Sequence, residues 1–415
     1  MAFVIDNEPR AYDWGAPGAL GRLRGSVSRA FHTGTSIDGV FPVTDADAPE
    51  AELWLGTHPA WPSVVAEGPR AGQSLPTALA AEGRPVDVGF LLKLLAIERP
   101  LSVQVHPDAV QARAGFAREE AAGVPIDAPQ REYRDPNAKP EMIFVLSDVF
   151  ELCAGFRPAE EIAADVEVLA ALDTDPAWSG LLAALADEAP IEAAAHRLLD
   201  ADRAGARRAT ARLQHLHDAG RLTGALPDET RGALLARLLE TYPGDPGTAF
   251  SLLLHHQRLQ RGQAAYLRPR TPHFYISGVG VELMGPSDNV LRAGLTSKHV
   301  DAAELLRVLD FDAEGPERLF EYHKGPMTVF HAAGAGLRLA FTRAHAQGAI
   351  DVPFHDGDIA YVLRGALTLV NTDGTVQHLG TGQAALLVDV ARAEFADDAE
   401  GHGMVLVAGA TEVVA

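Results

Sequence analysis

Two polar side chains alternate with two valines in the stretch LSVQVHPD, which runs from Leu101 to Asp108. Because successive side chains of a strand point to opposite faces, Gln104 and His106 share one face and the valines share the other. An amide and an imidazole side by side are candidate metal ligands. A half-buried strand with a wet polar face explains the same pattern, and on these eight residues alone this ordinary interpretation is favoured.

Two further stretches hold residues suited to the same chemistry. In DPNAKPEMIF, Pro140 favours an extended Lys139, so that Lys139 and Glu141 project from one face of a strand. A surface ion pair, which contributes little to stability, is the alternative. In RPRTPHFYISG, a proline directly precedes His273, which is either a rigidly held ligand or part of an aromatic core.

Taken together, these stretches offer two nitrogen and two oxygen ligands, a set that suits zinc. The four residues are Gln104, His106, Glu141 and His273. Glutamine is unusual as a zinc ligand, but a set with one anionic member leaves the metal more Lewis acidity. Spacing alone does not show that the four converge, because His273 is far from the others in sequence.

The stretch VELMGPSDNVLRAGLTSKHVD, from Val281 to Asp301, has groups that suit a phosphate. Arg292 offers a planar fork of donors and Lys298 a point charge, with hydroxyl groups nearby. Glu282 interrupts an otherwise apolar alternating strand. A solvated loop with ordinary charges is the alternative, but Lys298 and Lys139 are two of only four lysines in the chain.

The elements that must position these residues are mostly strands. Short apolar or alternating runs separated by Pro and Gly predict β-structure up to about residue 152. From residue 158 to about 240, apolar residues at spacings of three and four predict helices, and another helix is expected from Asp301. Alternation returns after residue 314, with an Asp-Gly pair that suits a hairpin turn. This final region lacks a His-x-His cluster and is expected to be a metal-free β-domain.

Composition limits the classes of function. The 415 residues include 35 basic and 56 acidic ones, and the net charge of -21 disfavours nucleic acid and anionic membranes as partners. Cys153 is the single cysteine, which excludes internal disulfides and cysteine zinc fingers. The start of the chain lacks a secretion signal, and no run reaches the length of a membrane helix. We expect a cytoplasmic protein that is a monomer or a weak homo-oligomer.

The sequence resembles the type I phosphomannose isomerases of the cupin superfamily. The matching motifs follow one another in order from about residue 8 to 301, apart from the helical stretch, and become weaker beyond it. They are AYDWG, AELWLGTHP, FLLKLLAIERPLSVQVHPD, DPNAKPEMIF, ELCAGFRP and PRTPHFYISG, which runs on to SDNVLRAGLTSKHVD.

The resemblance implies a zinc-dependent enzyme with one ion per chain. The zinc ligands would be Gln104, His106, Glu141 and His273; the catalytic residues Arg292, Lys139, Glu282 and Asp288; and the substrate-binding residues Ser102, Trp14 and Lys298. For an aromatic such as Trp14 or Trp54, packing in a β-core is the favoured alternative to a role in the pocket wall. Two positions depart from the family pattern, since Ala109 and Ala138 stand where relatives often have Lys and His.

The implied fold is mainly β, with a cupin-type β-barrel (jelly-roll) catalytic domain. Its expected bounds are 1–152 and 259–313, with an α-helical insertion at 153–258 and a second, C-terminal β-domain at 314–415.

The implied reaction interconverts the phosphosugars mannose 6-phosphate and fructose 6-phosphate through an enediol(ate). Arg292 stays protonated and is therefore no general base, whereas Lys139 and Glu282 are candidates for moving the proton. Two other classes stay open, an iron-dependent cupin oxygenase and a sugar-binding protein without activity. The first is disfavoured by Gln104 as a fourth ligand, the second by an intact ligand set. A related phosphosugar or a free aldose is the alternative substrate.

Overall fold

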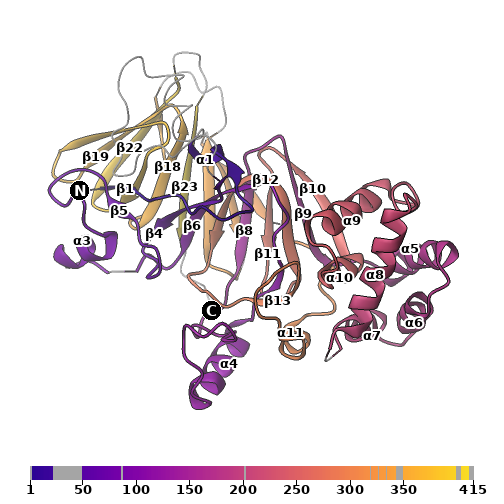
Figure 1. Ribbon diagram of the computed structural model, residues 1–415. Coiled ribbons are helices and arrows are strands. Elements are labelled where there is room, and N and C mark those ends of the chain that lie inside the picture. Colours follow the sequence, from indigo (N-terminus) through magenta and orange to yellow (C-terminus); the bar gives the residue numbers. More distant parts are fainter. Residues whose placement is uncertain are drawn as a thin grey trace.

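The computed structural model describes nine stretches of the chain: residues 2–21, 49–85, 87–200, 202–317, 319–325, 327–332, 334–342, 349–398 and 403–410. Strands predominate over helices in these residues, as the sequence predicted. Figure 1 shows a helical part at one end, a β-rich C-terminal part at the other, and a sheet between them. No described helix is long and apolar enough to span a membrane.

The middle sheet contains nine of the described strands, and β12 lies at its centre. These strands are β4 (Glu52–Gly56), β6 (Leu91–Ile97), β7 (Val103–Val105), β8 (Glu141–Val145), β9 (Val149–Phe156), β10 (Leu254–Gln260), β11 (Ala264–Leu267), β12 (His273–Met284) and β13 (Leu291–Gly294). The first part of β12 pairs with β7 and β9, and the second with β6 and β8. A register shift between Tyr275 and Ser277 separates the two parts, so one strand connects both halves of the sheet.

Strand β7 shows why its residues alternate. Val103 and Val105 are almost fully buried in one apolar cluster with the helices of the next region, such as Trp178 and Leu213. The strand therefore buries its valine face under the helices and leaves Gln104 on the other face.

The helical part lies between β9 and β10 in sequence. It consists of α5 (Ala159–Leu172), α6 (Pro176–Leu185), α7 (Pro190–Leu198), α8 (Ala204–Asp218), α9 (Glu229–Thr241), α10 (Gly247–Phe250) and a 3-10 turn (Ser251–Leu253). Asp175 and Asp228 accept hydrogen bonds from backbone N–H groups at the starts of α6 and α9, which stabilises these ends. Ile162, Val166 and Leu169 form the buried stripe of α5 at the spacing expected of an amphipathic helix.

The C-terminal part is a pair of sheets around a shared apolar core. Its strands are β14 (Phe320–Lys324), β15 (Met327–Ala332), β16 (Leu337–Thr342), β17 (Ile350–Asp351), β18 (Asp358–Arg364), β19 (Ala366–Asn371), β20 (Val376–Gly380), β21 (Ala384–Leu387), β22 (Val390–Ala396) and β23 (Met404–Ala410). Leu367 and Phe395 of the smaller sheet pack with Val405 and Val407 of the larger one. The predicted Asp-Gly hairpin is confirmed, because Gly374 turns with φ 83° between β19 and β20.

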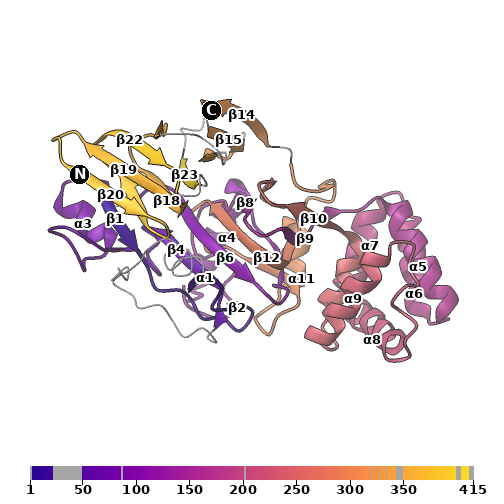
Figure 2. The same cartoon turned by 90° about the horizontal axis from the view of Figure 1, so that it is seen from above.

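The larger C-terminal sheet also takes in two strands from the start of the chain. Its order is β14-β15-β16-β23-β18-β21-β1-β5, where β1 is Phe3–Asp6 and β5 is Val64–Val65. Figure 2 shows β1 beside the C-terminal strands. The described pairing is that of an open sheet, so the jelly-roll and the domain bounds, which this pairing crosses, stay predictions.

The remaining elements lie around the two large sheets. They are β2 (Ala16–Pro17), β3 (Pro49–Glu50), α1 (Ala19–Gly21), α3 (Leu75–Ala81), α4 (Ala109–Ala121) and α11 (Ala302–Val308). Asp108 begins α4 with a capping box that includes Gln111, so the HPD of the opening stretch ends a strand and begins a helix.

Candidate metal centre and substrate site

Strand register places three of the predicted site residues on one face of the middle sheet. Gln104 on β7 lies opposite His273 on one side and opposite Arg292 on the other. Residues directly opposite each other on neighbouring antiparallel strands project from the same face. Gln104 therefore shares a face with a predicted zinc ligand and with the predicted catalytic arginine.

His106, Glu141 and His273 form a compact buried cluster. The Nε2 atom of His106 lies 3.3 Å from Oε1 of Glu141, and that of His273 lies 3.1 Å from Oε2. The candidate ligand atoms of the three residues lie within 4.8 Å of one another. Each side chain is at most 4% exposed, so all three are directed at one interior point.

Hydrogen bonds orient both imidazole rings for metal binding. Nδ1 of His106 lies 2.7 Å from the carbonyl oxygen of Asn289, and Nδ1 of His273 lies 2.9 Å from that of Thr271. A carbonyl only accepts, so each Nδ1 carries a proton, and Nε2 is the ring atom that each histidine can offer to a metal. Nε2 of His106 is buried and makes no well-directed hydrogen bond among the described residues. Together with one carboxylate, this donor set fits zinc.

The charges around the cluster act on the protonation of His106 and Glu141. Burial, followed by the nearby charge of Lys139, lowers the pKa of His106 to about 4, so the ring is neutral at pH 7. Burial opposes ionisation of Glu141, but Lys139 and His106 lower its pKa well below the usual range. Nζ of Lys139 lies 3.0 Å from Oε1 of Glu141, which agrees with their predicted position on one face.

Asn289 connects His106 to the segment that leads into β8. Its side chain is fully buried. The Oδ1 atom accepts hydrogen bonds from the backbone N–H groups of Arg134 (2.7 Å) and Asp135 (3.2 Å). The Nδ2 atom donates to the carbonyls of Asp135 (2.8 Å) and Asn137 (3.0 Å). One residue thus orients a candidate ligand and fixes the loop before Lys139 and Glu141. Its sequence context, a turn-forming SDN, did not predict this role.

A second buried charge cluster contains Glu282 and a residue that sequence reasoning missed. Lys93 stands opposite both Trp54 and Glu282 in the sheet, its Nζ atom 3.3 Å from Oε2 of Glu282. The hydroxyl of Tyr275 donates to Oε1 of the same carboxylate at 3.0 Å. Lys93 is the only charged residue in the apolar run FLLKLLA, and this was the available signal.

The remaining predicted catalytic and substrate residues lie in less buried positions. Oδ1 of Asp288 is 3.6 Å from Nε2 of His58, and its backbone N–H donates to Asp135. Ser102 is half-buried just before β7. Trp14 stacks on Tyr12 and packs against a core cluster that includes Ile97, which is the structural role expected of an aromatic.

Three arginine side chains lie close enough to Lys298 to act on its charge. Burial, then the positive charge of Arg292, lower the pKa of Lys298; Glu52 opposes this shift, and Arg134 and Arg10 add to it. Burial also lowers the pKa of Arg292. The guanidinium of Arg10 is 4.7 to 5.1 Å from the ring centres of Tyr12, Trp54 and Trp61, a cation–π arrangement that fixes its place. This concentration of positive charge suits an anionic ligand.

The two departures from the family pattern lie at the edge of the site. Ala109 is the first residue of α4, and Ala138 is half-buried in the loop that Asn289 fixes. Neither offers a side chain for chemistry.

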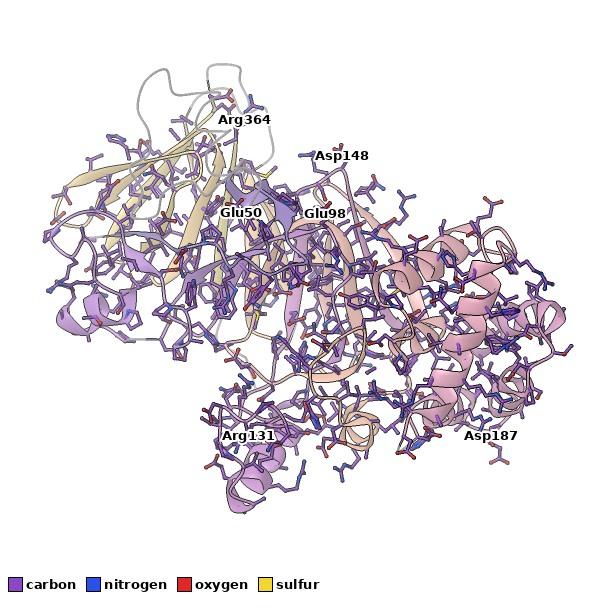
Figure 3. All side chains as sticks on the ribbon, viewed as in Figure 1. Glu50, Glu98, Arg131, Asp148, Asp187 and Arg364 are labelled. Carbon is purple, nitrogen blue, oxygen red and sulfur yellow. The ribbon has the colours of Figure 1, made fainter. Side chains whose placement is uncertain are left out.

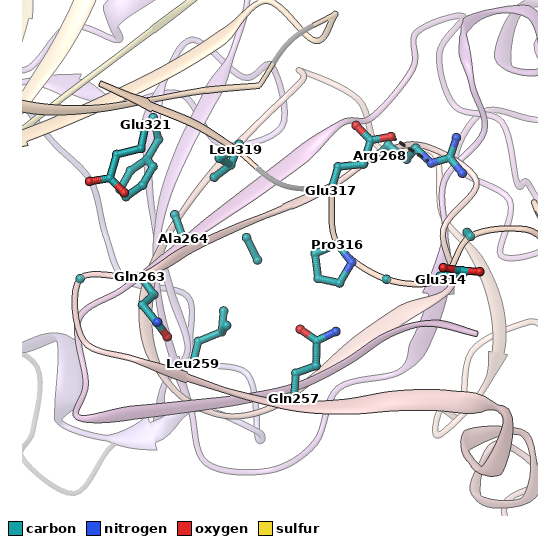
Figure 4. Close-up of a pocket in the computed structure, with 15 residues that line it drawn as sticks. Gln257, Leu259, Gln263, Ala264, Arg268, Glu314, Pro316, Glu317, Leu319 and Glu321 are labelled. Carbon is teal, nitrogen blue, oxygen red and sulfur yellow. Dashed lines mark ion pairs between the residues drawn. The ribbon is translucent and has the colours of Figure 1, made fainter. Parts of the chain in front are cut away.

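A separate pocket of about 650 Å³ lies between the β10–β11 hairpin and the segment from Ala313 to Glu321. Figure 4 shows Gln257, Arg268 and Glu317 in its wall, with an ion pair between the last two. None of its lining residues belongs to the metal cluster.

Comparisons with known proteins identify relatives of this chain. The family described as phosphomannose isomerase type I, catalytic domain, matches residues 2–159. The mannose-6-phosphate isomerases of Shigella flexneri and Escherichia coli (strain K12) are each 34% identical over 323 residues, which covers 75% of this chain and 76% of theirs. The solved mannose 6-phosphate isomerase from Salmonella typhimurium, bound to substrate and to a zinc atom, is 27% identical with a TM-score of 0.80 and covers 99% of both chains.

Proposed function

The chain belongs to the type I phosphomannose isomerase family, and we propose that it interconverts mannose 6-phosphate and fructose 6-phosphate with one zinc ion per chain. The proposed ligands are Gln104, His106, Glu141 and His273. The observation that carries the proposal is the buried cluster of two imidazoles around one carboxylate, with both Nδ1 atoms held by carbonyl oxygens. Relatives named as mannose-6-phosphate isomerases support the substrate.

The bound zinc would supply Lewis acidity for the oxygen atoms at the reacting carbons. The proton must leave C2 of the open-chain aldose and return to C1, while a hydroxyl proton moves between the two oxygens. Negative charge develops on oxygen in the enediol(ate) between these steps. One well-placed donor to such a charge contributes about 3 to 4 kcal/mol in comparable sites.

We assign the carbon-to-carbon proton transfer to Glu282. Burial, followed by the negative charge of Glu141, raises the pKa of Glu282 above its ordinary value. A carboxyl with a raised pKa both accepts and returns a proton efficiently near neutral pH. The 3.0 Å hydrogen bond from Tyr275 fixes its orientation.

Lys93 is assigned to charge stabilisation. Burial opposes its charge, but Glu52 and Glu282 raise its pKa above the ordinary value, so the ammonium keeps its proton. A permanently protonated group 3.3 Å from Glu282 stabilises the carboxylate before the transfer and the enediol(ate) after it.

The four cationic side chains described above are proposed to bind the phosphate group of the substrate. Arg292 and Lys298 are proposed to hold the phosphate or the developing charge, with Arg10 and Arg134 adding to the positive potential. Ser102 and Asp288 are proposed to bind the sugar hydroxyls. Arg292 stays protonated, because a guanidinium does not lose its proton near neutral pH.

A coupled isomerase assay on phosphosugars and free sugars, with and without chelator, tests the proposal. We expect activity on mannose 6-phosphate that chelation removes and zinc restores. His106→Ala is expected to abolish zinc binding and activity. His378→Ala, which removes an exposed imidazole on β20, is the matched control and should retain both. Full activity after metal removal refutes the zinc assignment, and turnover of free aldoses alone refutes the phosphosugar assignment.

A further inference from the structure

Glu132 is a buried carboxyl that takes no part in the steps assigned above. It is 5% exposed. Its Oε2 atom is buried with no hydrogen-bond partner among the described residues, and its Oε1 atom lies 3.9 Å from Nε2 of His299. Burying a polar atom without a partner costs free energy. A ligand that formed a hydrogen bond with Oε2 would remove this cost.

The neighbouring Arg131 holds Glu132 in place. Its guanidinium pairs with Glu119 at 3.0 Å and Glu120 at 2.7 Å on α4, and donates to the carbonyl of Tyr133 at 2.6 Å. Figure 3 shows Arg131 in the lobe that contains α4. The backbone N–H of Glu132 donates to Glu119. These contacts hold the segment that contains Glu132 against α4.

Cationic residues of the proposed phosphate site lie near Glu132 and act on its pKa. The charged and titratable groups that face it are Arg292, Asp301, Glu119, Arg134 and His299. The attractive charge of Arg292 is the largest among them, and Nε of Arg292 is also buried without a hydrogen-bond partner in the described chain. Glu132 and Arg292 form no ion pair, although each is the other's leading opposite charge.

We propose that Glu132 is a residue of the substrate site, where its protonated carboxyl donates a hydrogen bond to the phosphate group of the sugar. The inference rests on the proposed function, since that function places the phosphate beside Arg292. A neutral carboxyl adds a donor without cancelling the positive charge there. An ionised carboxyl has no donor and repels the anion.

The protonation of Glu132 makes the proposal measurable. Burial, against the attraction of Arg292, raises the pKa of Glu132 to about 8, so the carboxyl is mostly protonated at pH 7 and mostly ionised at pH 9. A phosphate monoester, with a second pKa of about 6, remains a dianion over this range. The protonated fraction of a group with a pKa of about 8 falls on the order of tenfold from pH 7 to pH 9. The KM for mannose 6-phosphate should therefore rise on the order of tenfold over this range.

Two substitutions separate hydrogen bonding from charge. Glu132→Gln keeps a donor and cannot ionise. Its KM at pH 7 should stay within about twofold of wild type, and the rise of KM from pH 7 to pH 9 that depends on Glu132 should disappear. Glu132→Ala lacks the donor, so its KM at pH 7 should exceed that of wild type, and the Glu132-dependent rise toward pH 9 should be absent. Asp127→Asn, which removes a solvent-exposed charge from the same segment, is the control and should keep the wild-type profile because water and salt screen that charge.

The outcomes distinguish this inference from the proposed function. An unchanged rise of KM in Glu132→Gln would assign the effect to loss of charge on Lys298 and overturn the inference. If the wild type does not isomerise mannose 6-phosphate, the proposed function fails. Calorimetric titration with inorganic phosphate at pH 7 and pH 9 then decides the role of Glu132. Equal phosphate affinity in wild type, Glu132→Gln and Glu132→Ala at both pH values refutes it.

Discussion

Asn289→Ala is expected to weaken folding and zinc binding together. The side chain makes four hydrogen bonds of 2.7 to 3.2 Å to the backbone of the loop before β8. Its own carbonyl orients His106. Alanine keeps this carbonyl but removes the side-chain bonds to the loop. The loop leads directly to Lys139 and Glu141.

The magnitude follows from the number of bonds. At about 1 kcal/mol for each, and with Oδ1 shared by two donors, the loss of unfolding free energy should be about 2 to 4 kcal/mol. Substitutions in the shell that orients metal ligands typically reduce metal affinity by about 10 to 100-fold, and we expect a loss in this range. The kcat at saturating zinc should fall as well, because Lys139 moves with the loop.

Asn371→Ala provides a control of the same residue type. Asn371 is 2% exposed in the C-terminal part and bonds to Ala2, Thr375 and Gln377 at 2.9 to 3.1 Å. Chemical unfolding with chelator present measures stability, and competition with a chromophoric chelator measures zinc affinity. Both variants should lose stability, and Asn289→Ala alone should lose zinc affinity. Equal zinc affinity in the two variants would refute the idea that the loop positions the ligands.

Three further outcomes are expected. Glu282→Gln should lower kcat by about 10²- to 10⁴-fold with zinc content unchanged; a wild-type kcat would transfer the proton-shuttling role to another group such as Lys139. Lys298→Ala should raise the KM for mannose 6-phosphate by about tenfold and leave kcat near wild type, and an unchanged KM removes Lys298 from the phosphate site. Burial raises the pKa of the Cys153 thiol to about 12, so an alkylating reagent at pH 8 should modify Cys153 only after unfolding, which mass spectrometry detects. Rapid modification of the native protein contradicts the buried position.

Local patterns predicted the features that depend on neighbouring residues. The alternation in LSVQVHPD placed Gln104 and His106 away from the valines, because a strand repeats every two residues. The same rule placed Lys139 with Glu141. Apolar residues at spacings of three and four predicted helices from residue 158 to about 240, and α5 to α9 lie in this stretch.

Long-range positions depended on pairing that no local pattern encodes. The partner of Lys93 is Glu282, which stands opposite it only through the register of β6 and β12. Asn289 is part of a turn in sequence, and its contacts with residues 134 to 137 arise from tertiary packing. His273 was grouped with the other candidate ligands by the chemistry of its side chain, and spacing could not show that it lies near them. Glu132 gave no signal at all, since its role depends on burial.

The pairing of β1 with β21 has a consequence for the synthesis of the chain. Phe3 lies opposite Leu386, so β1 leaves the ribosome more than 380 residues before its partner in β21. At typical elongation rates of about 5 to 20 residues per second, β1 waits roughly 20 to 80 s for β21, whereas its other neighbour, β5, is made much sooner. The apolar strand that contains Phe3, Val4 and Ile5 lacks one of its two neighbours during this time, so we expect the nascent chain to be a substrate for chaperones. The pairing of β1 with β21 is therefore expected late in folding, long after the metal ligands have been synthesised.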